Sequence, residues 1–257
     1  MTWNPGKEYR FVRLLGNGAF ARVYLAEDRA GRKYACKVSG RGELLEREAA
    51  YQRQAGHPLF PAFCAFWQEN GRGALLMEYV PGESLDAALR REGAFSDRKA
   101  AGIGCLLAEG LSHLHERRLP LVFRDVKPSN VMLTPEGGVR LLDFGCVCPA
   151  GRNVDRAGTP EFGAPEQFAR DGLQTAAADI YGLGRTLQEL TGGRPGGLLK
   201  RIADRCTRQD PRERFSNMRE LAEMLKLCAE GGTGRMSGRQ RAALKGEIRV
   251  LQDVHVW

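Results

Sequence analysis

The sequence lacks a hydrophobic run long enough to cross a lipid bilayer. Its longest apolar stretch lies around residues 100–108 of the 257, whereas a membrane-spanning helix needs roughly 20 apolar residues. The first eight residues, MTWNPGKE, also lack the apolar segment of a secretory signal. We therefore expect neither a transmembrane segment nor a secretory leader.

The chain also lacks the cysteine and histidine patterns of disulfide-rich or metal-binding proteins. Its seven cysteines are an odd number and are scattered through apolar segments, which is typical of thiols in a reducing compartment, here the cytoplasm. Cys146 and Cys148 form a CxC pair without further ligands nearby, and we interpret them as simple thiols. His113 and His115 lack further ligands too, which favours packing or solvent exposure over metal binding.

Composition indicates a folded chain with a basic surface. Hydrophobic residues make up 42% of the sequence, enough to bury the core of one large domain or of two small lobes. The formal net charge of +8 suits acidic proteins, nucleic acid or anionic membranes, but charge alone does not choose among them. No nucleic-acid recognition module is visible, so we expect no specific nucleic-acid partner and interpret the charge as a solvated surface.

One stretch carries the chemistry of phosphoryl transfer. Residues 123–130 read FRDVKPSN, and Asp143 follows shortly, before a Phe-Gly pair. Asp125 can accept a hydroxyl proton, and Lys127 can neutralise a moving phosphoryl group. Asn130 and Asp143 offer the hard oxygen ligands that magnesium prefers. The stretch therefore predicts phosphoryl transfer from a magnesium-bound nucleotide.

This stretch resembles the catalytic and metal-binding loops of the eukaryotic-type, or Hanks-type, serine/threonine protein kinase family. Nearly all of residues 9–228 follow the order of that family's motifs. The resemblance implies an α+β bilobal fold, with a small β-rich N-terminal lobe that has one main helix and a larger helical C-terminal lobe. The expected bounds are residues 1–80 and 81–230, followed by a basic tail at 231–257. The compact sequence and small loops are similar to bacterial members of the family.

A glycine-rich turn is the first expected nucleotide contact. Residues 10–15 and 23–27 predict two strands, and the turn between them carries Gly16 and Gly18, where backbone amides can approach phosphate oxygens. Alone, such a pair more often indicates a plain hairpin turn. The family has a third glycine where this chain has Ala21, while the resemblance implies that Val23 lies over the adenine.

A lysine in an apolar strand is the second expected nucleotide contact. Residues 34–38 alternate as a strand around Lys37, whose buried ammonium needs anionic partners. The resemblance implies that these are the nucleotide phosphates and a glutamate on the helix predicted over residues 43–54. We choose Glu48 by its spacing to the following His-Pro turn. Gln52, where the family usually has an apolar residue, is a departure.

A buried strand that ends at a Pro-Gly break covers residues 74–82. By itself it indicates only a strand and a turn. The resemblance implies that Met77 lies at the back of the adenine pocket and that the backbones of Glu78 and Val80 bind adenine. It also counts Ala35 and Met132 among the nucleotide-binding residues.

The segment that follows Asp143 has one hydroxyl side chain up to Glu166, that of Thr159. Together with the Lys-Pro pair at residues 127–128, it resembles serine/threonine kinases, in which this threonine bonds near the catalytic residues. We therefore expect activity without phosphorylation of this segment. The resemblance further implies that Asp179 is a buried anchor of the catalytic loop and that Arg214 pairs with Glu166.

The sequence thus predicts a kinase that uses ATP and Mg²⁺ to phosphorylate Ser or Thr of a protein, which can be the kinase itself. One alternative is a pseudokinase scaffold, favoured by Ala21 and Gln52. Another is a small-molecule kinase, because residues 191–197 leave little room for the substrate-docking region of the family. The basic tail could bind a membrane or a partner, or pack on the domain. Substrate, activating signal and oligomeric state are not predicted.

Overall fold

The computed structural model describes residues 8–153 and 157–231 and divides the chain into two compact units. The first unit comprises residues 1–83 and 131–147, and the second comprises residues 84–130 and 148–257. The expected lobe bounds at residues 80 and 81 stay a prediction, and residues 131–147 group with the first unit. The basic tail lies outside the described residues, apart from Gly231.

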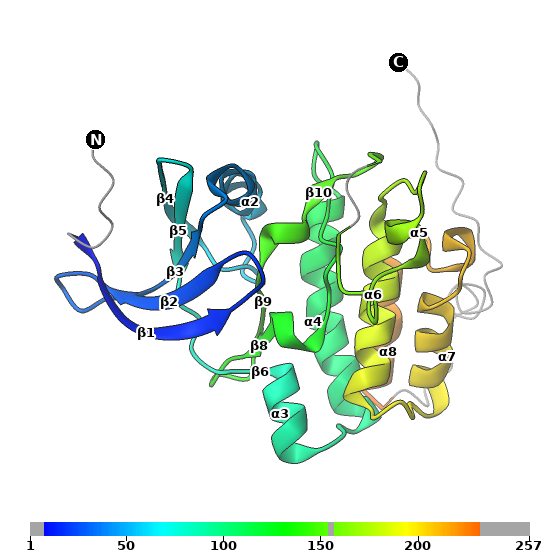
Figure 1. Ribbon diagram of the computed structural model, residues 1–257. Coiled ribbons are helices and arrows are strands. Elements are labelled where there is room, and N and C mark those ends of the chain that lie inside the picture. The colour runs from blue at the N-terminus through cyan, green and yellow to red at the C-terminus, as the bar shows by residue number, and fades with distance from the viewer. Residues whose placement is uncertain (1–7, 154–156, 232–257) are drawn as a thin grey trace. The chain divides into compact units, whose positions relative to one another are not determined.

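The first unit contains a five-stranded antiparallel sheet (Figure 1). Its spatial order is β1-β2-β3-β5-β4, so only β4 and β5 exchange places relative to the chain. The strands are β1 (Arg10–Asn17), β2 (Arg22–Glu27), β3 (Lys33–Ser39), β4 (Phe63–Glu69) and β5 (Arg72–Glu78). The strands expected before and after the glycine-rich turn are present, as is the one around Lys37.

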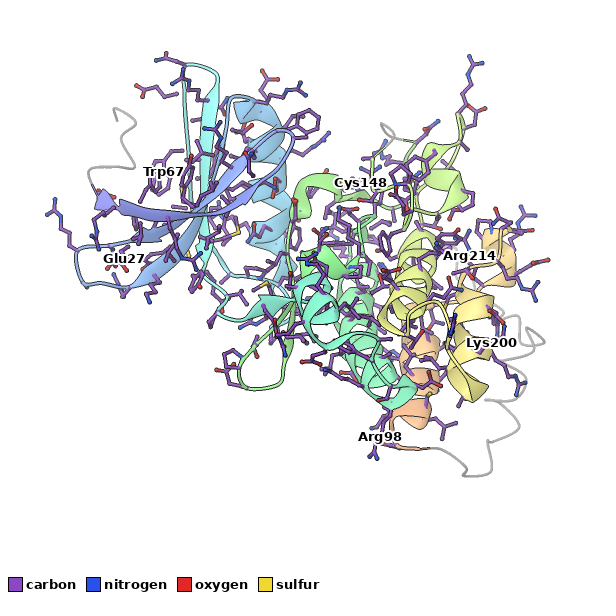
Figure 2. The ribbon with its side chains drawn as sticks, turned by 60° about the horizontal axis from the view of Figure 1, so that its bottom comes forward. Glu27, Trp67, Arg98, Cys148, Lys200 and Arg214 are labelled. Atoms are coloured by element: carbon purple, nitrogen blue, oxygen red, sulfur yellow. The ribbon has the colours of Figure 1, made fainter. Side chains whose placement is uncertain are left out.

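Helix α2 (Gly42–Ala55) covers one face of this sheet beside β4 and β5 (Figure 1). Its apolar positions Leu45 and Ala49, one turn apart, pack on Leu75 of β5. The helix ends where Gly56 adopts a left-handed conformation with φ of 56°. A second cluster contains Cys36 and Leu76, against which Trp67 of β4 packs (Figure 2). The sheet is thus apolar on both faces.

The second part of the first unit is a hairpin of β8 (Val131–Leu133) and β9 (Val139–Leu141), followed by the 3-10 turn η2 (Phe144–Cys146). Gly82 lies against this hairpin with φ of 131°, and a Cβ atom there would lie 1.9 Å from the Leu133 carbonyl oxygen. Only glycine fits such a position. The two-residue strand β6 (Glu83–Ser84) follows at the boundary of the unit.

The second unit is mainly helical, which confirms the expected α+β class with a helical C-terminal part. Its helices are α3 (Leu85–Glu92), α4 (Asp97–His115), α5 (Pro165–Phe168), α6 (Ala176–Leu190), α7 (Gly197–Cys206) and α8 (Met218–Ala229). The short elements are β7 (Leu121–Val122), β10 (Cys148–Pro149) and the 3-10 turns η1 (Pro128–Asn130) and η3 (Pro211–Glu213). Helix α4 packs along α8, and α6 packs against α7 (Figure 1).

Serine side chains begin two of these helices. Ser84 accepts a hydrogen bond from the Ala87 amide, and Ser96 accepts one from the Lys99 amide. Each thereby satisfies one of the amides that have no partner within the first helical turn. None of the helices in the described part of the chain is long and apolar enough to cross a membrane.

A buried arginine joins the end of η3 to helix α5. The Arg214 side chain is fully buried and forms two parallel hydrogen bonds to Glu166, of 2.6 and 2.9 Å (Figure 2). It also donates to the carbonyl oxygens of Ala177 and Arg208. Because charge and hydrogen-bonding capacity are both matched, this pair can be buried. The expected partner of Arg214 is confirmed.

Candidate functional site

An ion-paired lysine lies at the centre of the first unit. Lys37 Nζ lies 2.7 Å from Glu48 Oε1 and 2.7 Å from Asp143 Oδ1. Strand β3 supplies the lysine, α2 supplies Glu48, and Asp143 lies between β9 and η2. Two other glutamates of α2, Glu43 and Glu46, are exposed. The Lys37–Glu48 pair is the one that the spacing of the sequence indicates.

This three-member cluster has more negative than positive charge. Burial alone would lower the pKa of the Lys37 ammonium, but the carboxylates of Asp143 and Glu48 outweigh burial and raise it. Burial, with the like charge of Asp143, raises the pKa of Glu48 to about 7. Asp143 is the accessible member, with a side chain 48% exposed, against 12% for Lys37. Lys37 therefore stays cationic, and Asp143 is the carboxylate that solvent or a ligand can reach.

The glycine-rich turn joins β1 to β2 in the same unit. The Gly18 amide donates to the Ala21 carbonyl oxygen and closes the turn at 2.9 Å. A Cβ atom on Gly16 would meet no heavy atom within 4 Å, so the protein itself does not fill the space beside this backbone. This open backbone fits the approach of phosphate oxygens.

The remaining predicted nucleotide residues also belong to the first unit. Ala35 lies directly opposite Met77 on neighbouring strands, as Val23 lies opposite Lys37. The Glu78 amide donates to the Ala62 carbonyl oxygen at 2.9 Å, so a contact of its backbone with adenine would have to use the carbonyl. The members of this predicted set are Gly16, Gly18, Val23, Ala35, Lys37, Glu48, Met77, Glu78, Val80 and Met132.

In the second unit, one aspartate carboxylate is held by three donors. Thr159 Oγ1 donates to Asp125 Oδ1 at 2.8 Å, and Lys127 Nζ lies 2.8 Å from Asp125 Oδ2. Asn130 Nδ2 donates to the same Oδ2 at 2.9 Å. A carboxylate offers about four lone-pair positions, and two of these three donors use Oδ2. Oδ1 thus keeps room for one further hydrogen-bond donor, such as a hydroxyl group.

Lys127 and Asn130 are fixed by the same contacts. Lys127 Nζ also donates to Thr159 Oγ1 at 2.5 Å, so the threonine hydroxyl bridges Lys127 and Asp125. Asn130 Nδ2 makes a second hydrogen bond to the Asp125 carbonyl oxygen at 2.9 Å. Because its NH₂ group faces Asp125, its amide oxygen is the atom left for a cation. Asp125, Lys127 and Asn130 are therefore brought together.

A buried aspartate anchors the loop that carries Asp125. Asp179 is fully buried on α6 and accepts from the backbone amides of Phe123 and Arg124, at 2.8 and 2.6 Å. Arg124 adopts a left-handed conformation with φ of 69°, which non-glycine residues adopt only where other contacts hold them. His115 Nε2 lies 2.8 Å from the same carboxylate. The expected anchor role of Asp179 is confirmed, and His115 packs beside it.

The comparison with known families agrees with this geometry, because the protein kinase domain matches residues 9–198. The chain belongs to the protein kinase domain family. The RAC-beta serine/threonine-protein kinase of Homo sapiens is 31% identical over 201 residues, which cover 73% of this chain and 41% of that protein. RAC-beta serine/threonine-protein kinase A of Xenopus laevis is 32% identical over 73% of this chain and 40% of its own length.

A third relative of this kinase domain aligns over more of its length. The cAMP-dependent protein kinase catalytic subunit PRKX of Mus musculus is 28% identical over 92% of this chain and 70% of its own. By contrast, the chain spans less than half the length of the two RAC-beta kinases. The relatives named here are vertebrate proteins, so the comparisons do not support the bacterial origin that the compact sequence suggested.

Some contacts of the kinase domain were not found from its sequence. The direct pairing of Lys37 with Asp143 was missed, because the two are far apart in the chain. Arg140 on β9 bonds Glu78 and the Pro58 carbonyl oxygen, which ties the end of β5 to the hairpin.

Two buried glutamines also make contacts that the sequence did not predict. Gln52 donates to the Pro61 carbonyl oxygen and so satisfies its amide in the core. The buried Gln167 side chain, with three hydrogen bonds, was also missed. None of these has a local sequence signal.

Proposed function

We propose that this kinase domain transfers the γ-phosphoryl group of ATP to serine or threonine hydroxyl groups of proteins. The observation that carries the proposal is the arrangement of Asp125, Lys127 and Thr159, in which one hydroxyl group bridges a carboxylate and an ammonium. Family membership and the serine/threonine kinases among the relatives support it. The buried cysteines are thiols and not disulfides, which supports a reducing compartment such as the cytoplasm.

Asp125 would orient the acceptor. Its Oδ1 atom has room for one more donor besides Thr159 Oγ1, and a substrate hydroxyl would fill that position and pass its proton there. Lys127, held at Oδ2, would stabilise negative charge on the transferred group. Because phosphoryl transfer depends mostly on positioning and charge neutralisation, these two side chains would supply much of the acceleration.

The first unit would hold the nucleotide. Lys37, oriented by Glu48, would bind its phosphates, and the backbone at Gly16 and Gly18 would cover them. Asp143 of this unit has an accessible carboxylate, and Asn130 of the second unit has an amide oxygen left over from its hydrogen bonds; each is a type of ligand that Mg²⁺ prefers. Mg²⁺ held by such ligands would neutralise phosphate charge.

The acceptor is a protein side chain in this proposal, although the connection between α6 and α7 is short. Residues 191–196 are all that separates the two helices, so the substrate must be held by other surfaces. A small-molecule acceptor would need less surface. The pairing of Glu166 with Arg214 beside the Thr159 segment favours the protein, since this segment resembles that of protein kinases.

The test is transfer of labelled γ-phosphate from ATP with Mg²⁺ to generic protein acceptors and to the protein itself, for the wild type and Asp125→Ala. We expect label on serine and threonine that is lost in the variant. Label on tyrosine alone would overturn the proposed specificity. If the wild type binds ATP but labels no protein, the phosphotransferase proposal fails for proteins, and a screen of metabolite acceptors separates a small-molecule kinase from a scaffold.

A further inference from the structure

The side chain of Gln167 occupies a buried position between two segments of the second unit. It is 2% exposed and lies in the short helix α5. Its Nε2 donates to the Arg124 carbonyl oxygen at 2.8 Å and to the Ala157 carbonyl oxygen at 3.0 Å. Its Oε1 accepts from the Ala164 amide at 2.9 Å. All the polar atoms of the side-chain amide are therefore used, with well-formed geometry.

Two of these bonds join the segments that hold Asp125. Arg124 directly precedes Asp125, and Ala157 is two residues before Thr159, the donor to Asp125 Oδ1. A single NH₂ group thus fixes the spacing between the backbone that carries the carboxylate and the backbone that carries its hydroxyl partner. The third bond orients Gln167 itself by fixing its oxygen on the amide that opens α5.

The neighbouring glycine shows how closely the segments approach. Gly158 has a φ of 120°, and a Cβ atom there would lie 2.7 Å from Gln167 Nε2 and 3.0 Å from the Arg124 carbonyl oxygen. No L-residue side chain fits this conformation and space without moving one of those groups. Glycine at position 158 is therefore what allows the Gln167 amide to approach so closely.

We propose that Gln167 is a positioning residue for the phosphoryl-transfer step, which keeps Thr159 and Asp125 in register by bonding both of their backbone segments. The inference rests on the proposed function. This role explains how Thr159 is held against Asp125 Oδ1. In the sequence, Thr159 carries the only hydroxyl side chain after Asp143 up to Glu166. The glutamine amide performs this role within the folded chain, without a modification of the segment.

Gln167→Glu tests the donor role with little change of shape. The carboxylate can still accept from the Ala164 amide, but it cannot donate to the two carbonyl oxygens and repels them. We expect kcat to fall at least about tenfold, because positioning of Asp125 is lost, and KM for ATP to change less than about twofold. Gln209→Glu, at an exposed position of the same unit, is the matched control and should resemble the wild type.

The pH dependence of Gln167→Glu and two further variants separate a positioning role from general damage to the fold. In Gln167→Glu, burial beside two carbonyl oxygens favours the protonated form of the introduced carboxyl group, which then regains one O–H donor. The ratio of kcat for this variant to kcat for the wild type should therefore rise about threefold or more from about pH 8 to about pH 6. Gln167→Met, which cannot donate at any pH, should lose activity without this recovery. Gly158→Ala should lower kcat by displacing the same amide.

Amide hydrogen exchange gives a readout that does not depend on catalysis. In Gln167→Glu and Gln167→Met, exchange in residues 157–163 should rise about tenfold or more over the wild type, while exchange in α4 stays unchanged. If kcat, its pH dependence and exchange all match the wild type, Gln167 has no positioning role. If exchange rises but the wild type itself transfers no phosphate, the coupling stands and the proposed function fails. If α4 exchange rises equally, Gln167 supports the fold as a whole, and the proposal is overturned.

Discussion

Lys37 Nζ lies within hydrogen-bonding distance of both carboxylate oxygens of Glu48, at 2.7 and 2.9 Å. We predict that Glu48→Gln lowers kcat/KM for ATP about 10²-fold, because the uncharged amide no longer orients the ammonium for the phosphates. Glu46→Gln, on the exposed side of the same helix, should stay within about twofold. Steady-state kinetics with varied ATP measures both. Equal effects of the two variants would contradict the role assigned to Glu48.

Thr159 should stay unphosphorylated in active protein. A phosphate on Oγ1 would remove the hydroxyl donor to Asp125 and place negative charge beside its carboxylate. We predict that Thr159→Ser retains most activity and that Thr159→Val loses about 10²-fold in kcat, because valine keeps the shape without the hydroxyl. Mass spectrometry of the active protein gives the stoichiometry. A high Thr159 phosphate content in active protein would be incompatible with this prediction.

Burial determines how much two arginine–glutamate pairs in the second unit contribute to the free energy of unfolding. Arg214→Met should lower the free energy of unfolding by about 3–5 kcal/mol, because Glu166 loses a fully buried partner. Arg219→Met removes a pair with Glu116 whose side chains are 68% and 48% exposed, and should cost no more than about 1 kcal/mol. Urea unfolding of both variants tests the difference. Similar losses would show that burial does not set the stability of these pairs.

Cysteine reactivity should follow burial. All seven cysteines lie in described parts of the chain, and none forms a disulfide. Burial raises the pKa of Cys36 to about 12, and burial also raises the pKa of Cys206 far above its usual value. Near pH 8 we expect alkylation of exposed Cys64 but not of Cys36 or Cys206 until guanidinium unfolds the chain. Rapid labelling of Cys36 in the folded protein would contradict its buried position.

Much of the fold follows from local signals in the sequence. The strand around Lys37 shows period-two alternation, and Ser84 and Ser96 mark helix starts through ordinary capping chemistry. Glu48 could be selected over its neighbours because its spacing to the following His-Pro turn resembles that of the family, and it is the buried glutamate of α2. Asp179 and Arg214 were expected from the family resemblance rather than from any local pattern.

The contacts that were missed depend on the approach of distant segments. Gln167 bonds the Arg124 carbonyl oxygen 43 residues away, and Lys37 bonds Asp143 across 106 residues. Neither periodicity nor capping gives information about such pairs. A glutamine directly after Ala164-Pro165-Glu166 is compatible with a solvent-exposed helix start, so only the packed structure shows its bonds. The roles of the nucleotide-binding residues stay predictions.

The most direct test of the account compares nucleotide binding with phosphoryl transfer in Asp125→Asn. This variant leaves the first unit untouched and removes the carboxylate that receives the hydroxyl proton. We predict that kcat falls about 10²–10⁴-fold, while the Kd for ATP with Mg²⁺ stays within about twofold of the wild type. A variant that transfers phosphate at the wild-type rate would contradict the assignment of Asp125 and, with it, the proposed mechanism.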